Sequence, residues 1–106
     1  LTAMARFFAV FATDQPGMRD VRDRVRPIHR TYLRSADQHG VVVRLGGPTL
    51  DPHGDAMNGT LLVVEADDIQ AVMRFIGNDP YVKEGLFSHV EVRPWDWSLG
   101  NPEQRV

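Results

Sequence analysis

Cysteine is absent from the 106 residues of this sequence. Its absence excludes disulfide bonds, thiolate metal ligands and cysteine nucleophiles together, and it fits the reducing cytoplasm, which we take as the expected location. An excess of one charge is also absent, because 12 basic and 14 acidic residues give a formal net charge of −2. No apolar run approaches the roughly 20 residues that a membrane-spanning helix needs. We therefore expect neither a nucleic acid nor a membrane as a partner.

The length predicts a single domain with a small core, which association with a second copy would help to stabilise. We expect the domain to occupy residues 4–95 and a polar tail to follow over residues 96–106. Residues 1–3 precede Met4, which we expect to be the natural start, and we interpret them as a remnant foreign to the natural protein.

Apolar, β-prone runs alternate with amphipathic segments in an order that is typical of one fold class. Strands are predicted over residues 6–12, 41–45, 59–66 and 86–95, a long helix from near Arg26 to Gly40, and a second helix capped by Asp67 or Asp68 and ended by Gly77. Residues 79–85 are predicted to form a turn or a short helical piece. The order β-α-β-β-α-β predicts a ferredoxin-like α+β fold with an antiparallel sheet.

Pro27 sets the expected start of the long helix. Proline fixes φ and lacks an N–H, so it fits the first turn of a helix and not the interior, and residues 18–24 are therefore expected to form a loop or a single turn. Apolar spacing within the helix then defines one stripe, made of Ile28, His29, Tyr32, Leu33 and Ala36. Because Arg26, Arg30 and Arg34 line a different face, we expect His29 to point with the buried stripe.

The strands over residues 6–12 and 59–66 are apolar on both faces. In a two-layer α+β domain the helices cover one face of the sheet, so something else must cover the other. The simplest cover is the same sheet from a second copy. We therefore expect a homodimer formed through the sheet face.

His29 is the first candidate for chemistry. In the first turn of a helix, the positive end of the helix dipole would disfavour the imidazolium form, whereas a nearby carboxylate would favour it. Opposed effects of this kind suit a general base. From the residues alone, a partly buried core histidine bonded to a backbone carbonyl is the favoured interpretation.

Three further features are candidates, each with an ordinary alternative. Asp79 precedes a proline and is either a partner for His29 or a simple turn starter. The glycines of Gly46-Gly47-Pro48 would let a ligand approach the backbone, or they mark a bend or bulge at the end of a strand. Arg26 would hold a carboxylate substrate or be solvated.

Other residue types argue against two kinds of site. His39, His53 and His89 do not stand at metal-ligand spacing, so we expect no metal. Relatives of this topology that bind RNA stack bases on aromatic residues of the third strand, and residues 61–64 include none. Trp95 and Trp97 are therefore expected to pack against a neighbouring subunit.

Four short motifs in this order resemble the YCII-related (YciI-like) family. They are Arg26-Pro27-x-His29, Gly46-Gly47-Pro48, Asp79-Pro80-Tyr81 and the finish His89-Val90-Glu91-Val92-Arg93-Pro94, and the resemblance extends over about residues 4–95. It implies a ferredoxin-like dimeric α/β barrel. It also implies a catalytic His29–Asp79 pair in a cleft, with Arg26, Gly46, Gly47 and Pro48 as substrate-binding neighbours.

The resemblance further implies an activity without a cofactor. Characterised members and related barrels include a dehydrochlorinase of aromatic-ring degradation and muconolactone isomerases, so we expect a lyase or isomerase that transfers a proton on a small molecule such as an aromatic-derived acid. His29 would act as the base and Asp79 would orient its ring. The alternative is a small-molecule-binding or regulatory dimer without catalysis. A purely structural dimerisation domain predicts no pocket beside His29.

Overall fold

The computed structural model describes residues 6–103. Within this range, four antiparallel strands form one sheet in the order β2-β3-β1-β4. Met4 and the three residues before it lie outside that range. In chain order the elements are β1 (Arg6–Asp14), α1 (Arg19–Arg34), the 3-10 helix η1 (Ala36–His39), β2 (Val42–Leu50), β3 (Met57–Ala66), α2 (Ile69–Gly77), α3 (Pro80–Lys83) and β4 (Phe87–Trp95). The predicted ferredoxin-like βαββαβ order is confirmed.

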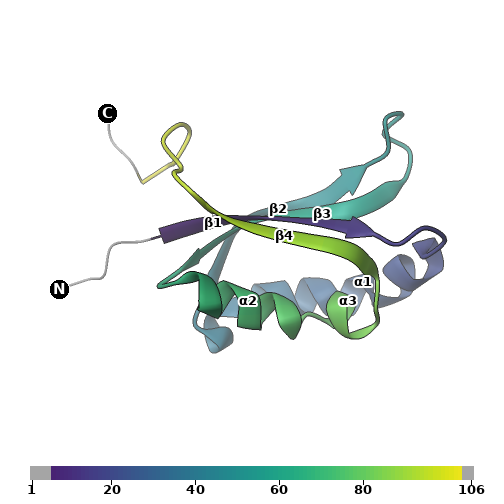
Figure 1. Ribbon diagram of the computed structural model, residues 1–106, viewed down its shortest axis with the longest axis horizontal. Helices are drawn as coiled ribbons and strands as arrows, with labels where there is room; N and C mark the ends of the chain where they lie inside the picture. Colours follow the sequence, from purple (N-terminus) through teal and green to yellow (C-terminus); the bar gives the residue numbers. More distant parts are fainter. Residues whose placement is uncertain (1–5, 104–106) are drawn as a thin grey trace.

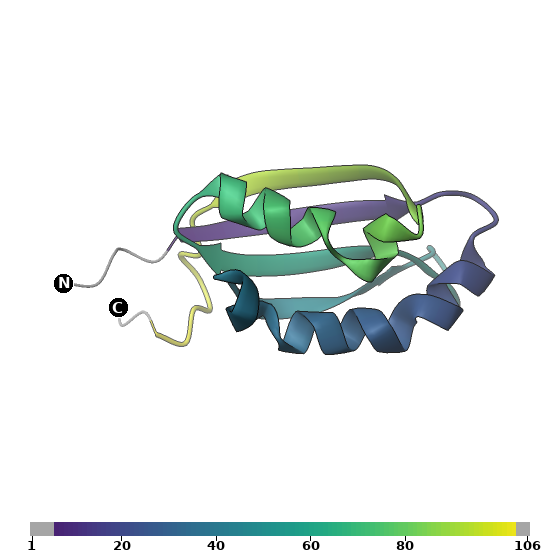
Figure 2. The same ribbon diagram turned by 90° about the horizontal axis from the view of Figure 1, so that it is seen from below.

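The helices all lie on one face of the sheet, and the opposite face carries none of them (Figure 1). Seen from the helical side, α1 runs beside the β2 edge, whereas α2 and α3 lie toward β1 and β4 (Figure 2). Within residues 6–103 no helix combines the length and the apolar character that crossing a membrane requires. The arrangement places α1 and α3 side by side, and the candidate site lies at their contact.

Two clusters of buried apolar side chains join the layers. The larger cluster packs the helical face of the sheet against α2, through residues that include Phe8, Val10, Leu62, Val64, Val72, Phe75 and Ile76. The smaller one consists of Val25 on α1, Tyr81 on α3 and Leu86 before β4. Each large apolar side chain that is fully buried contributes about 1.5–3 kcal/mol, so the smaller cluster firmly holds α3 against α1.

The prediction that the long helix begins near Arg26 is wrong. Helix α1 begins at Arg19 and includes Pro27 in its interior. An interior proline costs about 3 kcal/mol, but Arg22 and Val25 are buried in the first two turns, and their packing and hydrogen bonds offset that cost. Pro27 itself is exposed, so the carbonyl that its missing N–H leaves free can bind water. The helix also ends at Arg34, and η1 covers part of the remaining predicted length.

The prediction that the second strand ends at the two glycines is wrong. Strand β2 bulges between Val43 and Leu45 and then continues through Gly46-Gly47-Pro48 to Leu50, paired with β3. Proline is tolerated there because β2 is an edge strand of the sheet. A Cβ atom on Gly46 would lie 2.8 Å from Cδ2 of Leu62, so a larger residue at this position would displace the Leu62 side chain.

The face of the sheet opposite the helices exposes large apolar side chains on three of its strands and is largely uncovered. Phe11 and Leu61 on the central strands are 47% and 39% exposed, and Leu45 on β2 is 52% exposed. The predicted two-faced character of the strands is therefore present. The exposed patch has no protein cover within residues 6–103 beyond the tail described next.

The expectation that both tryptophans pack on a neighbouring subunit is wrong for Trp97. Its side chain is buried within its own chain, edge-on to Phe7 at 5.4 Å between ring centroids and stacked on Trp95 at 5.7 Å. Arg44 of β2 adds an ion pair with Glu103. The described part of the polar tail thus packs back onto one end of the sheet.

Candidate active site

His29 lies on the buried stripe of α1, together with Arg22 and Val25. The three positions are three and four residues apart, which places them on one face of the helix. The expectation that His29 points inward therefore holds, although Ile28, assigned to the same stripe, is 62% exposed. Because α1 begins at Arg19, His29 lies in the third turn, and the dipole of the helix start, which acts within the first turn, does not reach it.

Asp79 stands between α2 and α3 and has two partners. Its Oδ1 accepts a hydrogen bond of 2.9 Å from the backbone N–H of Tyr81, which makes it the N-cap of α3. Pro80 follows at the first helical position, where a missing N–H has no cost. Both carboxylate oxygens of Asp79 also lie 2.9 Å from Nδ1 of His29. The turn-starter role and the His29-partner role are thus both present in one residue.

The geometry assigns the two ring nitrogens of His29 different roles. An ionised carboxylate only accepts hydrogen bonds, so Nδ1 carries the proton that His29 donates to Asp79. In the neutral ring, Nε2 then holds a free lone pair. No group within residues 6–103 forms a hydrogen bond with Nε2. A histidine held in this way has the form of a general base.

Tyr81 stacks on one face of the His29 imidazole. Its ring centroid lies 4.0 Å from that of His29, with an angle of 21° between the planes. Nη1 of Arg22 donates a hydrogen bond of 3.3 Å to the Tyr81 hydroxyl. Burial raises the pKa of Tyr81, although the charges of Arg22 and Arg26 act to lower it, so the phenol stays neutral at ordinary pH. Tyr81 thus supports the His29 ring as an uncharged aromatic surface.

Arg22 ties this arrangement to the sheet. Its Nε and Nη2 donate to the two oxygens of Asp14 at 2.6 and 2.8 Å, and Nη2 also donates to Oγ1 of Thr60 at 2.9 Å. Burial acts to lower the pKa of Arg22, but its hydrogen bonds and the charge of Asp14 outweigh it and raise that pKa, so the guanidinium stays charged. The buried charge is therefore balanced by a bidentate carboxylate, as a buried ion pair requires.

A cavity of about 180 Å³ opens beside His29. It is lined by Arg22, Arg26, His29, Arg30, Leu33, Gly46, Gly47, Pro48, Thr60 and Tyr81. Of the six predicted site residues, five line this cavity, and Asp79 lies behind His29. The structure therefore brings all six together, although Gly46-Gly47-Pro48 does so from within β2 and not from a turn.

Arg22, Arg30 and Tyr81 share the cavity wall, although no functional role is predicted for them from the sequence. Arg22 stands three residues before Val25 and seven before His29, so it belongs to the same helical stripe. That spacing would have identified it had the helix not been expected to begin at Pro27. Tyr81 was visible only as the last residue of the Asp79-Pro80-Tyr81 motif.

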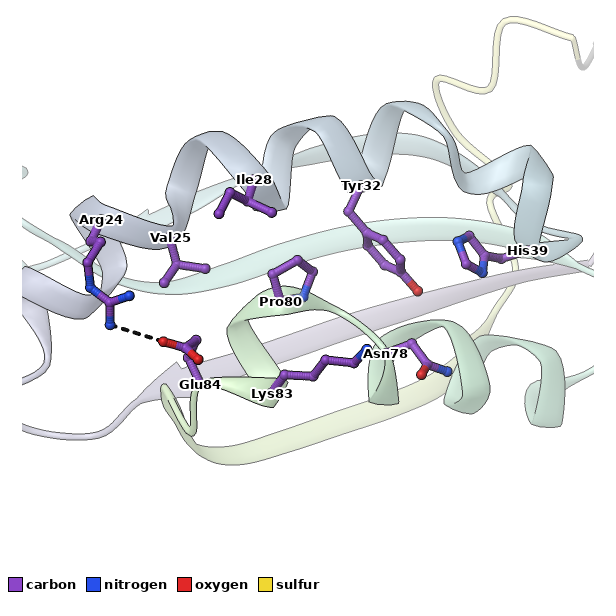
Figure 3. A pocket seen from close by; sticks show the side chains of 9 residues that line it. All are labelled: Arg24, Val25, Ile28, Tyr32, His39, Asn78, Pro80, Lys83 and Glu84. Atoms are coloured by element: carbon purple, nitrogen blue, oxygen red, sulfur yellow. Dashed lines mark hydrogen bonds and ion pairs between the residues drawn. The ribbon is translucent and has the colours of Figure 1, made fainter.

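A larger hollow lies between α1 and the segment that includes α3 (Figure 3). It measures about 760 Å³ and is lined by Arg24, Val25, Ile28, Tyr32, His39, Asn78, Pro80, Lys83 and Glu84. An ion pair of 3.0 Å between Arg24 and Glu84 crosses one end of it (Figure 3). Neither His29 nor Asp79 lines this hollow, so the smaller cavity is the better candidate for chemistry.

Comparison with known proteins places this geometry in context. The family described as YCII-related domain matches residues 6–96. Protein YciI of Escherichia coli O6:H1 is 27% identical over 92 residues, which cover 83% of this chain and 94% of YciI. An uncharacterized protein of Haemophilus influenzae is 26% identical, over 84% of this chain and 95% of its own.

Solved structures support the fold. The structure of the 5-chloro-2-hydroxyhydroquinone dehydrochlorinase TftG from Burkholderia phenoliruptrix, in complex with 2,5-dihydroxybenzoquinone, matches with a TM-score of 0.73 and 32% identity, over 85% of this chain and 93% of TftG. SnoaB, a cofactor-independent oxygenase from Streptomyces nogalater, matches with a TM-score of 0.53 and 17% identity, over 95% of this chain and all of SnoaB, a likeness of fold alone. The fold is of the ferredoxin-like dimeric α/β barrel class.

Replacing Asp79 with Ala should cost about 2–4 kcal/mol of unfolding free energy, because it removes a helix cap and leaves the buried Nδ1–H of His29 without its acceptor. Asp68 offers a matched control, since its Oδ1 caps α2 through the N–H of Ala71 at 2.9 Å and the residue is exposed. Asp68→Ala should cost only about 1 kcal/mol. Urea denaturation measures both values, and equal losses would show that the contact with His29 adds nothing to stability.

Proposed function

The chain belongs to the YCII-related domain family, and from this premise we propose that it is an enzyme that transfers a proton on a small, ring-shaped acid without a cofactor, in a reaction of the lyase or isomerase type. The observation that carries the proposal is the buried contact of 2.9 Å between Nδ1 of His29 and Asp79, at the wall of a cavity. A histidine oriented by a carboxylate in this way is a common general base.

The cavity supports a substrate of one-ring size. An engineered apolar cavity of about 150 Å³ holds benzene, so a space of about 180 Å³ suits one six-membered ring with a few polar substituents. The guanidinium groups of Arg26 and Arg30 border the space and favour an acidic substituent. TftG, 32% identical, acts on a chlorinated hydroxyhydroquinone according to its name. These three points agree on a phenolic or carboxylated ring.

The proposed reaction transfers protons and needs no external oxidant. Nε2 of His29 removes a proton from the substrate, and Asp79 stabilises the imidazolium that forms. In the lyase form, one hydroxyl proton of a chlorinated hydroquinone first moves to the ring carbon that bears chlorine, which gives a keto tautomer. His29 then removes the proton of the second hydroxyl, the two electrons that the ring gives up leave with the chloride ion, and a quinone remains with hydrogen in place of chlorine. In the isomerase form, His29 returns the proton to a different atom. Arg26 stabilises the negative charge that develops on a substrate oxygen.

Replacing His29 with Ala should lower the rate by about 10²–10⁴-fold, the usual contribution of a positioned general base. The first probe is 5-chloro-2-hydroxyhydroquinone, with chloride release and quinone absorbance as readouts. His39→Ala is the matched control, because His39 is exposed on η1 and does not line the cavity, and it should keep full activity. An unchanged rate in the His29→Ala variant would refute the base.

The same assay separates catalysis from the alternative of a binding or regulatory module. A module of that kind would bind 2,5-dihydroxybenzoquinone with equal affinity in the wild type and in His29→Ala, and would convert none of the probes. An enzyme would convert one of them at a rate that depends on His29. Calorimetric titration beside the turnover assay gives both answers from one set of proteins.

We further propose that two copies associate through the uncovered face of the sheet. This face exposes Phe11, Leu61, Leu45 and Trp95, and exposed apolar patches of this kind mark interaction sites. A second copy of the same sheet is the simplest apolar partner, and it would also enlarge the small core of a chain of this length.

Sedimentation equilibrium should find a dimer for the wild type and a monomer for Phe11→Asp, because the variant places a charge in the centre of the proposed interface. Met73→Asp is the control, since Met73 is 55% exposed on α2, on the helical side. It should remain dimeric. A monomeric wild type, or equal behaviour of the two variants, would contradict association through this face.

A further inference from the structure

Three arginines lie in a row on α1, beside the candidate active site. Arg26, Arg30 and Arg34 are spaced by four residues, so they follow one another along one side of the helix. All three line a second hollow of about 500 Å³, together with Asp23, Pro27, Thr31 and Met57. Arg26 and Arg30 also line the cavity beside His29. The cavity beside His29 and this hollow therefore share a wall that Arg26 and Arg30 form.

The row is electrostatically unfavourable as it stands. Like charges four residues apart repel one another and destabilise a helix. Within residues 6–103, none of the three arginines forms an ion pair. Even Asp23, which borders the same hollow, is not paired with any of them. Some other arginines of the described chain are paired, as Arg22 is with Asp14 and Arg24 with Glu84, whereas others, such as Arg19 and Arg74, are not. A cationic row of this kind is a suitable binding site for an anion from outside the chain.

We propose that this row binds a carboxylate that the substrate carries on a short side arm. The inference rests on the proposed function in one respect, that the ring of the substrate occupies the cavity beside His29. From there the arm passes Arg30 and places its carboxylate between Arg30 and Arg34. The substrate class is then a hydroxylated ring with an acetic or propionic acid side chain.

The distances along the helix fit an arm of this length. A rise of 1.5 Å per residue separates His29 and Arg34 by about 7.5 Å along the helix axis, a distance that a short arm and an extended arginine side chain cover together. Guanidinium groups bind carboxylates through paired hydrogen bonds. A carboxylate attached directly to the ring would stay at Arg26, so Arg34 is the residue that distinguishes a side arm from a ring acid.

Two ring compounds with and without the arm test the proposal. Calorimetric titration of the full chain compares 2,5-dihydroxyphenylacetate with methylhydroquinone, which has the same ring and no carboxylate. The acid should bind about tenfold more tightly, the effect expected of hydrogen bonds to a charged group. Arg34→Gln should remove most of that advantage and leave the affinity for methylhydroquinone unchanged. Arg74→Gln, which removes the same charge from an exposed position on α2, should change neither affinity.

Equal affinity of the wild type for the two compounds would overturn the inference, and so would an advantage that survives Arg34→Gln. The titrations are repeated in the His29→Ala variant, which separates this inference from the proposed function. Turnover that does not depend on His29 would refute the base while the preference for the arm remains. Loss of the preference, with turnover still dependent on His29, would refute the side arm alone.

Discussion

The contact between Asp79 and His29 is the interaction on which the account depends. One carboxylate caps α3 through the N–H of Tyr81 and accepts the proton on Nδ1 of His29. The cap fixes where α3 begins, and α3 in turn places Tyr81 in the stack on His29. Local structure and candidate chemistry are therefore linked through a single side chain, and the site is rigid because the same bonds stabilise the fold.

A second constraint is the burial of Arg22 in the first turns of α1. Its guanidinium connects β1, β3 and α3 through Asp14, Thr60 and Tyr81. This network holds the start of α1 against the sheet and stabilises the helical turns that precede Pro27. The same network closes one wall of the cavity, while Arg26 and Arg30 are left with free charges beside it. One face of α1 is thus structural, and the adjoining row is available to a ligand.

Most of the fold could be predicted from the sequence, because the apolar periods and the turn residues agree with one another. The residues alone left the grouping of His29 with Asp79 as one of two alternatives, and the family resemblance favoured it, since spacing alone does not report a contact across 50 residues. The prediction of the α1 start is wrong because it considered only the local cost of a proline inside a helix. The burial of Arg22 and Val25, which offsets that cost, arises only in the folded chain. The continuation of β2 through Gly46-Gly47-Pro48 was missed for a similar reason, because its pairing with β3 is not local.

The protonation of the His29 ring decides whether this histidine can act as the base. The chain contains four histidines, and in protein labelled with ¹⁵N-histidine, long-range ¹H–¹⁵N correlation spectra distinguish their tautomers, with His29 assigned from a His29→Gln variant. At a pH where the ring is neutral, we expect Nδ1 to carry the proton and Nε2 to be free to accept one. A His29 ring protonated on Nε2 would contradict it, because that nitrogen could not then act as the base.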